Sequence, residues 1–160
     1  MAQAHIAVVE RFAVPPGTLF EALVDHEGMS AWLGAKVTVL RGDGGVGTVR
    51  RLHLGPVVLD EEITYADAPR RLVYRVVRGD AGLLRFHRGE VVVEAWGRTG
   101  STVRWDVLLD TVVPGASRPL ELALGAVLRR GLRRLRDRFA AEELGVAPPA
   151  GDGDPRVVDG

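Results

Sequence analysis

Residues 117–144, SRPLELALGAVLRRGLRRLRDRFAAEEL, form the stretch that decides the fold. Apolar side chains recur there every three to five residues, which is the spacing of one buried stripe along an α-helix. The stripe consists of Leu120, Leu124, Val127, Leu128, Leu132, Leu135 and Phe139. Pro114 and Gly115 separate this stretch from the preceding chain. The sequence therefore predicts one long C-terminal helix that needs an extended apolar surface to pack against.

Residues 36–113 predict that surface. Six β-rich runs follow one another there, separated by turn signals: VTVLRG, TVRRLHL, VVLDEEITY, RLVYRVV, FHRGEVVVEAW and TVRWDVLLDTVV. Runs at spacings of roughly 8 to 14 residues, without helices between them, indicate an antiparallel meander rather than a parallel sheet. The glycine-rich segment 42–47 lacks a Gly-Lys-Ser/Thr sequence and precedes a strand, so it predicts a hairpin turn and not a phosphate loop.

The chain before the meander predicts one further strand and two short helices. Residues 5–14 carry apolar side chains at even spacing, and Pro15 and Pro16 end the strand. Thr18 is placed to cap a helix that runs to about residue 25, with Glu21 as its capping-box partner. Residues 28–33 predict a second, shorter helical piece.

These elements predict an α+β domain over residues 1–144, in which a seven-stranded antiparallel sheet wraps around the long C-terminal helix. The two short helices lie between the first and second strands. A chain of 160 residues is long enough to bury a core with an internal cavity. Residues 145–160, GVAPPAGDGDPRVVDG, offer little to bury, and we expect them to be disordered.

The composition excludes several classes of function. The absence of cysteine excludes disulfides, thiolate metal sites and a cysteine nucleophile. The 21 basic residues balance the 21 acidic ones, whereas dedicated nucleic-acid binders usually show a basic excess. The four histidines are scattered singly and no Gly-x-Ser-x-Gly elbow occurs, so we expect no metal, no cofactor and no serine-triad hydrolase.

The sequence also carries a prediction about location. The first residues, MAQAHIAVVERF, lack the basic segment and the uninterrupted apolar run of a secretory signal. No run of about 18 apolar residues occurs that would span a membrane. We therefore expect a cytoplasmic protein without a membrane span.

Three motifs carry a resemblance to a known family. They are GVGTVRRL at 45–52, EEITYADAPRRLVYRV at 61–76 and RGEVVVEAWGRTGSTVRW at 88–105. With these motifs the chain resembles the helix-grip fold of the SRPBCC (START/Bet v 1-like) superfamily over residues 5–142, and most closely its bacterial polyketide cyclase/dehydrase-like branch. The resemblance implies a cavity between the sheet and the C-terminal helix.

Strand alternation predicts which polar side chains face that cavity, because successive residues point to opposite faces of a sheet. Glu61 shares its face with the apolar residues of its strand, and His87 shares a face with Gly89, Val91 and Val93. The third strand leaves two alternatives, with either Arg50 or the pair Arg51 and His53 inside. We favour Arg50, because a buried arginine beside Glu61 is paired. The predicted pocket residues are Arg50, Glu61, Tyr65, Tyr74, His87 and Trp105, with Met29, Trp32 and Phe86 at the mouth.

The resemblance implies cyclisation, aromatisation or dehydration of a polyketide-like substrate. In that mechanism His87 or Glu61 removes a proton, and Arg50 or a tyrosine stabilises the enolate. Structural interpretations stand beside these roles. Arg50 and Glu61 can form a structural ion pair, and His87 can be a residue that only lines the pocket. Tyr65, Tyr74 and Trp105 bind ligand in the first interpretation and pack the core in the second.

Three functions therefore remain open. The first is a cofactor-independent cyclase or dehydratase, and the second is a carrier or sensor for a lipid, isoprenoid or quinone. The third is a partner-binding module that uses the arginine-rich face of the helix, where six arginines lie between residues 129 and 138. That face is either a solvated surface or a docking surface for an acidic partner such as an acyl-carrier protein, at Arg129, Arg130, Arg133 and Arg134. The protein is expected to be a monomer or a homodimer.

Overall fold

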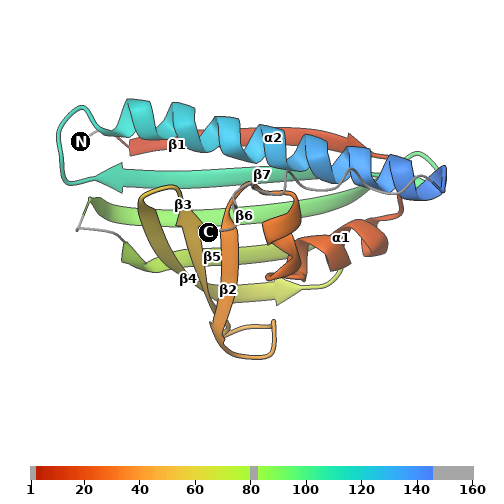
Figure 1. Ribbon diagram of the computed structural model, residues 1–160, viewed down its shortest axis with the longest axis horizontal. Coiled ribbons are helices and arrows are strands. Elements are labelled where there is room, and N and C mark those ends of the chain that lie inside the picture. Colours follow the sequence, from red (N-terminus) through yellow and green to blue (C-terminus); the bar gives the residue numbers. More distant parts are fainter. Residues whose placement is uncertain (1–2, 80–82, 146–160) are drawn as a thin grey trace, which may run out of the picture.

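The computed structural model of the chain describes residues 3–79 and 83–145 (Figure 1). Its elements in chain order are β1 (Gln3–Phe12), α1 (Pro16–Val24), the 3₁₀ turn η1 (Gly28–Ala31), β2 (Lys36–Arg41), β3 (Val49–Leu54), β4 (Val57–Asp67), β5 (Arg71–Gly79), β6 (Leu84–Trp96), β7 (Gly100–Thr111) and α2 (Ser117–Glu143). Every predicted strand and helix is present, with boundaries shifted by a few residues. Apart from Gly145, the predicted tail lies outside the described residues.

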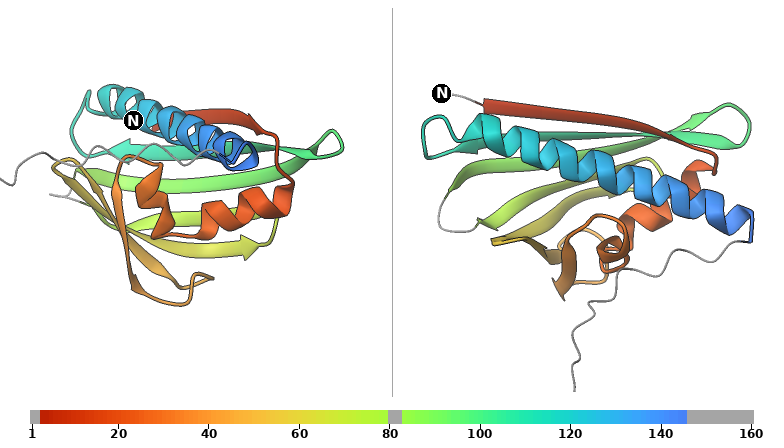
Figure 2. Two further views of the ribbon diagram at one scale, coloured as in Figure 1. Left: turned by 45° about the vertical axis from the view of Figure 1, so that its right-hand side comes forward. Right: turned by 45° about the horizontal axis from the view of Figure 1, so that its top comes forward.

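The seven strands form one antiparallel sheet in the order β1-β7-β6-β5-β4-β3-β2. Strands β2 to β7 are the predicted meander, and β1 pairs with β7, so that Ile6 lies opposite Val107. The sheet curves, and α2 lies along its inner face over β1 and β7, while α1 contacts β6 and β7 and η1 packs against β2 (Figures 1 and 2). The predicted helix-grip fold is confirmed.

Helix α2 approaches the chain after η1 closely because residue 131 is a glycine. A Cβ at this position would lie 3.2 Å from Leu33 Cα and 3.1 Å from Leu33 Cδ1. Leu128, Leu132 and Leu135 of the predicted stripe are buried around it. The helix is thus held against both the sheet and the segment that follows η1.

The predicted capping box at the start of α1 is wrong. The helix begins three residues earlier, at Pro16, and Pro15 occupies the N-cap position without a side-chain hydrogen bond. Proline suits the first helical position because its φ is already fixed and it has no N–H to satisfy. Thr18 therefore lies inside the helix. Ser30, in η1, has a different role, because its hydroxyl exchanges hydrogen bonds with the backbone of Val37 and ties η1 to β2.

Tyr65, predicted to face the cavity, and Phe86, predicted at its mouth, both lie on the outer surface. Tyr65 is 44% exposed because the β4–β5 register shifts between Ile63 and Tyr65, which turns the end of β4 over. The Arg71 guanidinium lies over the Tyr65 ring, 5.1 Å from its centroid. Phe86 is equally exposed, and its direction agrees with alternation, which places it on the face opposite His87. Strict alternation fails at Tyr65 because an irregular register breaks the two-residue period.

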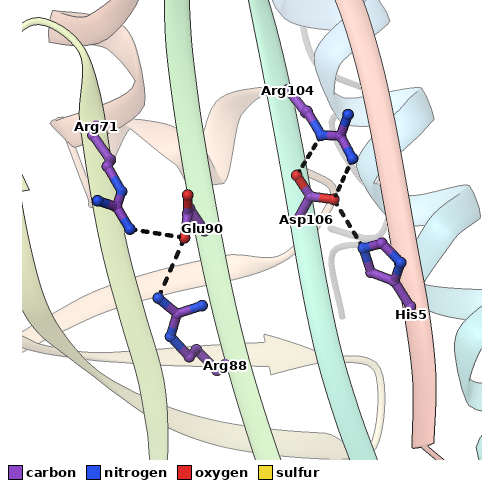
Figure 3. A network of polar contacts seen from close by, with 6 residues as sticks. All are labelled: His5, Arg71, Arg88, Glu90, Arg104 and Asp106. Carbon is purple, nitrogen blue, oxygen red and sulfur yellow. Dashed lines mark hydrogen bonds and ion pairs between the residues drawn. The ribbon is translucent and has the colours of Figure 1, made fainter.

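The outer face of the sheet carries a network of charges (Figure 3). Glu90 accepts hydrogen bonds from Arg71 and Arg88, while Asp106 pairs with Arg104 and with His5 of β1. These groups are partly exposed, which is the ordinary condition of a solvated sheet face. The apolar side chains of the same strands therefore face α2, and any cavity must lie on that inner side.

Candidate functional site

A cavity of about 250 Å³ lies between the sheet and the first half of α2, and we call it the outer cavity. Its sheet wall is made of Leu54, Val57, Leu59, Leu84 and Leu109, and its helix wall of Leu120, Ala123, Leu124 and Val127. The exposed residues Gly34, Gly55 and Ala123 mark its mouth. Among the described lining residues, His87 alone has a polar side chain. The outer cavity is therefore an apolar space with one hydrogen-bonding group.

A second, deep cavity of about 20 Å³ lies further inside, with room for about one water molecule. Its lining includes the polar groups of Arg50, Glu61, Tyr74 and Trp105. It shares the remaining polar residue, His87, with the outer cavity. The two spaces meet at this histidine, which separates an apolar chamber from a polar end.

Arg50 and Glu61 form a buried ion pair beneath α2. They lie directly opposite each other in the β3–β4 register, with side chains only 1% and 3% exposed. The Arg50 Nε donates to Glu61 Oε2 at 2.9 Å, and Nη2 lies 2.9 Å from the same oxygen. A buried charge is tolerated when it is paired and hydrogen-bonded. The preferred orientation of β3, with Arg50 inside, is thus the one observed.

His26 lies beside the Arg50–Glu61 ion pair, although no sequence pattern predicted this position. It follows α1 and is 3% exposed. Its Nε2 lies 3.0 Å from the Gly44 carbonyl, which can only accept, and its Nδ1 lies 3.0 Å from Arg50 Nη1, which can only donate. These partners require the neutral tautomer with the proton on Nε2. Burial lowers the pKa of His26, and the Arg50 guanidinium lowers it further.

The sequence holds no periodic signal for this role of His26. The residue lies between α1 and η1 and outside every strand, so that strand alternation does not apply to it. Its contact with Gly44 depends on how the turn of the β2–β3 hairpin lies against the α1–η1 connection. That turn contains Gly42, Gly44 and Gly47 in left-handed conformations. The predicted hairpin is confirmed, and it also supplies the hydrogen bond that orients His26.

Tyr74 lies at the centre of the deep cavity's wall. Its hydroxyl oxygen accepts a hydrogen bond of 2.9 Å from Trp105 Nε1, and the Arg50 guanidinium lies 5.0 Å from its ring centroid. Burial raises the pKa of the Tyr74 hydroxyl, which therefore stays protonated at neutral pH. Tyr74 and Trp105 are thus brought together as predicted, in contact with the charged pair.

His87 is buried at 4% exposure, and neither of its ring nitrogens has a hydrogen-bond partner among the described residues. The rings of Tyr74 and His87 pack edge to face, with 6.1 Å between their centroids. Burial lowers the pKa of His87, and Arg50 lowers it further, against an opposite effect of Glu61. A neutral imidazole has one donor and one acceptor. Both groups of His87 are therefore available inside the cavities.

The predicted mouth residues lie elsewhere. Met29 is fully buried at the deep end, where its Sδ lies 3.2 Å from Arg50 Nη1. Trp32 belongs to the buried core, and Phe86 and Tyr65 are on the outer surface. None of Trp32, Phe86 and Tyr65 lines either described cavity. The mouth is formed instead by small residues, which strand and helix periodicity do not mark.

A surface hollow of about 510 Å³ lies at the opposite end of α2, between Phe139 and the β6–β7 hairpin. Two of its three arginines, Arg11 and Arg136, are engaged already. Arg136 pairs with Glu10 at 2.9 Å, and the Arg11 guanidinium stacks over the Trp96 ring at 4.5 Å. In the described part of the chain, no cluster of three or more histidine, aspartate or glutamate side chains is arranged to hold a metal ion. The two cavities that meet at His87 are therefore the candidate site.

The fold and the cavity define a helix-grip protein with a hydrophobic ligand-binding cavity. The sequence matches the family described as polyketide cyclase / dehydrase and lipid transport over residues 3–140, and the chain belongs to this family. The predicted superfamily is thereby confirmed. A search of curated proteins gave no match. None of the helices in residues 3–79 and 83–145 is long and apolar enough to cross a membrane.

Solved structures share the fold at low sequence identity. A START superfamily protein from Mycobacterium smegmatis is 16% identical, with a TM-score of 0.72 over 88% of this chain and 98% of its own. A protein from Thermobifida fusca is 23% identical, with a TM-score of 0.73 over 87% of this chain and 95% of its own. A protein from Thermus thermophilus is 20% identical, with a TM-score of 0.73 over 87% of this chain and 99% of its own. These likenesses concern the fold alone.

Proposed function

We propose that the protein binds an apolar, partly oxygenated small molecule in the outer cavity, with His87 as its polar anchor. The observation that carries the proposal is the unpartnered, buried imidazole at the end of an otherwise apolar chamber. Buried polar groups in proteins nearly always have a hydrogen-bond partner, so a pair of free nitrogens favours a ligand that supplies one. An apolar pocket with few convergent polar groups is the usual form of a small-molecule site.

Catalysis is a second candidate, and one observation favours it. His87 is held neutral and buried, with free nitrogens, which is the state that a general base needs. The contacts of Arg50 and Glu61 support a different role for these two residues, because they engage each other and His26. In a cyclase or dehydratase of this design, His87 moves the proton. Arg50 and Glu61 then hold the shape and charge of the deep end.

Native mass spectrometry of protein purified from its own host tests the binding proposal. A co-purified apolar compound supports the proposal. If apolar compounds fail to bind even at their solubility limit, the proposal is contradicted. Incubation separates the two candidates, because a carrier returns the compound unchanged whereas an enzyme converts it. If conversion occurs, it should be lost in His87→Ala and retained in His53→Ala, because His53 is exposed and does not line either cavity.

An acidic partner is supported by the arginine patch, which we define as Arg129, Arg130, Arg133 and Arg134. All four are exposed, and none forms an ion pair within the described residues. The guanidinium of Arg134 lies beside Gly34, a residue of the outer cavity's mouth. A partner docked there, such as an acyl-carrier protein, would present a tethered substrate near the entrance.

Charge reversal tests this partner. The triple variant Arg130→Glu, Arg133→Glu and Arg134→Glu should weaken binding of an acidic carrier protein, and added salt should weaken the wild-type complex in the same direction. The matched control reverses Arg98, an exposed arginine of the β6–β7 turn. Binding that survives the triple variant unchanged would exclude the patch as the docking surface.

A further inference from the structure

We infer that the ligand of the outer cavity is uncharged: a small apolar body that carries one hydroxyl or carbonyl oxygen, which hydrogen-bonds to His87. This inference rests on the proposed function and narrows it, because it excludes carboxylates such as fatty acids and excludes amines. It follows from how the charged groups of the deep cavity are used, from the hydrogen-bonding capacity of His87, and from the size of the space.

Within the described lining of the two cavities, the charged side chains are Arg50 and Glu61, and they pair with each other. Arg50 donates from Nε to Glu61 and from Nη1 to His26 Nδ1 and Met29 Sδ, while its Nη2 lies 2.9 Å from Glu61 Oε2 as part of the ion pair, without a hydrogen bond of its own among the described residues. Arg134, which forms no ion pair within the described residues, lies at the surface beside the mouth. The pair is neutral as a unit, and the described lining of the outer cavity contains no charged side chain. A carboxylate in this space would be buried without a partner and near Glu61, and an ammonium would be buried near Arg50. Either arrangement is strongly unfavourable.

His87 offers a neutral head group both a hydrogen-bond donor and a hydrogen-bond acceptor. A hydroxyl group donates to one ring nitrogen or accepts from the other, and a carbonyl oxygen accepts from the N–H. A carboxylate would be held well only by a protonated imidazole, and burial disfavours that form by lowering the pKa of His87, against an opposite effect of Glu61. The histidine therefore distinguishes a neutral oxygen from an ionised one, although both are polar.

The volume sets the size of the ligand. The 250 Å³ of the outer cavity lies below the usual range for drug-sized ligands. This space suits an apolar body of roughly ten non-hydrogen atoms, such as a short chain or a single ring. A long-chain lipid or a polycyclic compound would have to extend out through the mouth.

A series of eight-carbon probes tests the charge preference on the wild-type protein. Octan-2-one, octan-1-ol, octanoate, octylamine and octane share their apolar part and differ in the head group. Dissociation constants are measured at pH 7.5 by NMR titration of the full chain. We expect the ketone and the alcohol to bind about 3- to 10-fold more tightly than octane, the effect of one neutral hydrogen bond. Octanoate and octylamine should bind more weakly than octane.

The variant His87→Leu tests the anchor, with a folding check by circular dichroism. It should bind octane as wild type does and lose the preference for the ketone and the alcohol, while His53→Leu keeps that preference. Octanoate or octylamine as the tightest ligand would overturn this inference and leave the proposed function standing. If none of the five probes binds, both are overturned. The wild-type series decides the charge preference even if the variant does not fold.

Discussion

Gly89 lies directly opposite Tyr74 in the β5–β6 register, and the tyrosine ring fills the space that a side chain at position 89 would need. A Cβ at position 89 would collide with ring carbons and the hydroxyl of Tyr74. The ring cannot move aside freely, because it is held between the Arg50 guanidinium and Trp105 Nε1. The wall of the deep cavity thus depends on the absence of a side chain on the neighbouring strand.

The substitution Gly89→Ala should destabilise the protein by about 1–3 kcal/mol, because overpacking forces Tyr74 out of its position. Thermal denaturation followed by circular dichroism measures the effect. Gly17→Ala is the matched control, since a Cβ at position 17 meets nothing within 4 Å and the residue lies in α1. The control should be neutral or slightly stabilising. A Gly89→Ala protein as stable as wild type would show that the Tyr74 ring is loosely held.

Removing one member of the buried ion pair should cost more than removing both. Glu61→Leu leaves the Arg50 charge buried without its partner, which we expect to cost about 3–5 kcal/mol of unfolding free energy. The double variant Arg50→Met with Glu61→Leu removes both charges and should recover most of that loss. Urea denaturation of the three proteins measures the difference. A double variant as unstable as Glu61→Leu, or less stable, would contradict the role of pairing.

Stability should decrease as the pH falls below about 6.5, the ordinary pKa of histidine. His26 and His87 both have lowered pKa values in the folded protein. In this range the unfolded chain binds protons that the folded chain does not, so acid favours unfolding. The loss continues down to the folded pKa values, and the contribution is fully present above about pH 6.5. Urea denaturation between pH 8 and pH 5 measures the slope.

Histidine variants show which residues cause the dependence of unfolding free energy on pH. His26→Gln and His87→Gln should each reduce the dependence of unfolding free energy on pH, and the double variant should remove more of it than either one alone. The side-chain amide of glutamine does not titrate, so that its contribution is constant across the range. A double variant with the wild-type slope would place the responsible groups elsewhere in the chain.

A bulky residue at the mouth should block ligand entry without unfolding the protein. Ala123 is exposed and lines the outer cavity, so Ala123→Trp fills the entrance. We expect binding of octan-2-one to weaken at least about tenfold, or about 1.4 kcal/mol, with little change in Tm. Leu122→Trp is the control, because Leu122 is exposed on the same turn and does not line the cavity. Equal binding by both variants would place the entrance elsewhere.

The fold was predictable because its elements carry strong periodic signals. The apolar stripe of α2 and the alternation in β6 and β7 predicted the layers, the sheet and the inward positions of His87 and Trp105, and pairing with Glu61 selected Arg50 in β3. The error at Tyr65 falls where the period breaks, because an irregular ladder leaves no mark in the residue pattern that alternation can detect. Phe86 was assigned to the mouth although the alternation of its own strand places it opposite His87.

The candidate site was predictable only where it lies on strands. His26 reaches Arg50 from a loop, and its position depends on the contact of that loop with Gly44 in the β2–β3 turn. The small residues of the mouth also have no pattern in the sequence that predicts them, because an opening forms where side chains leave space unfilled. Long-range packing decides both features, and a local pattern does not encode it.

The pairing of β1 with β7 has a consequence for how the chain folds. Val8 finds its partner Trp105 only after nearly a hundred intervening residues have been synthesised. Until then, the buried side of β1, with Ala4, Ile6 and Val8, is exposed to water and to other nascent chains. Contacts of such high sequence separation slow folding, because the intervening loop must close before they form. We expect β1 to dock late, so that chaperones which shield an amino-terminal apolar strand would raise the yield of folded protein.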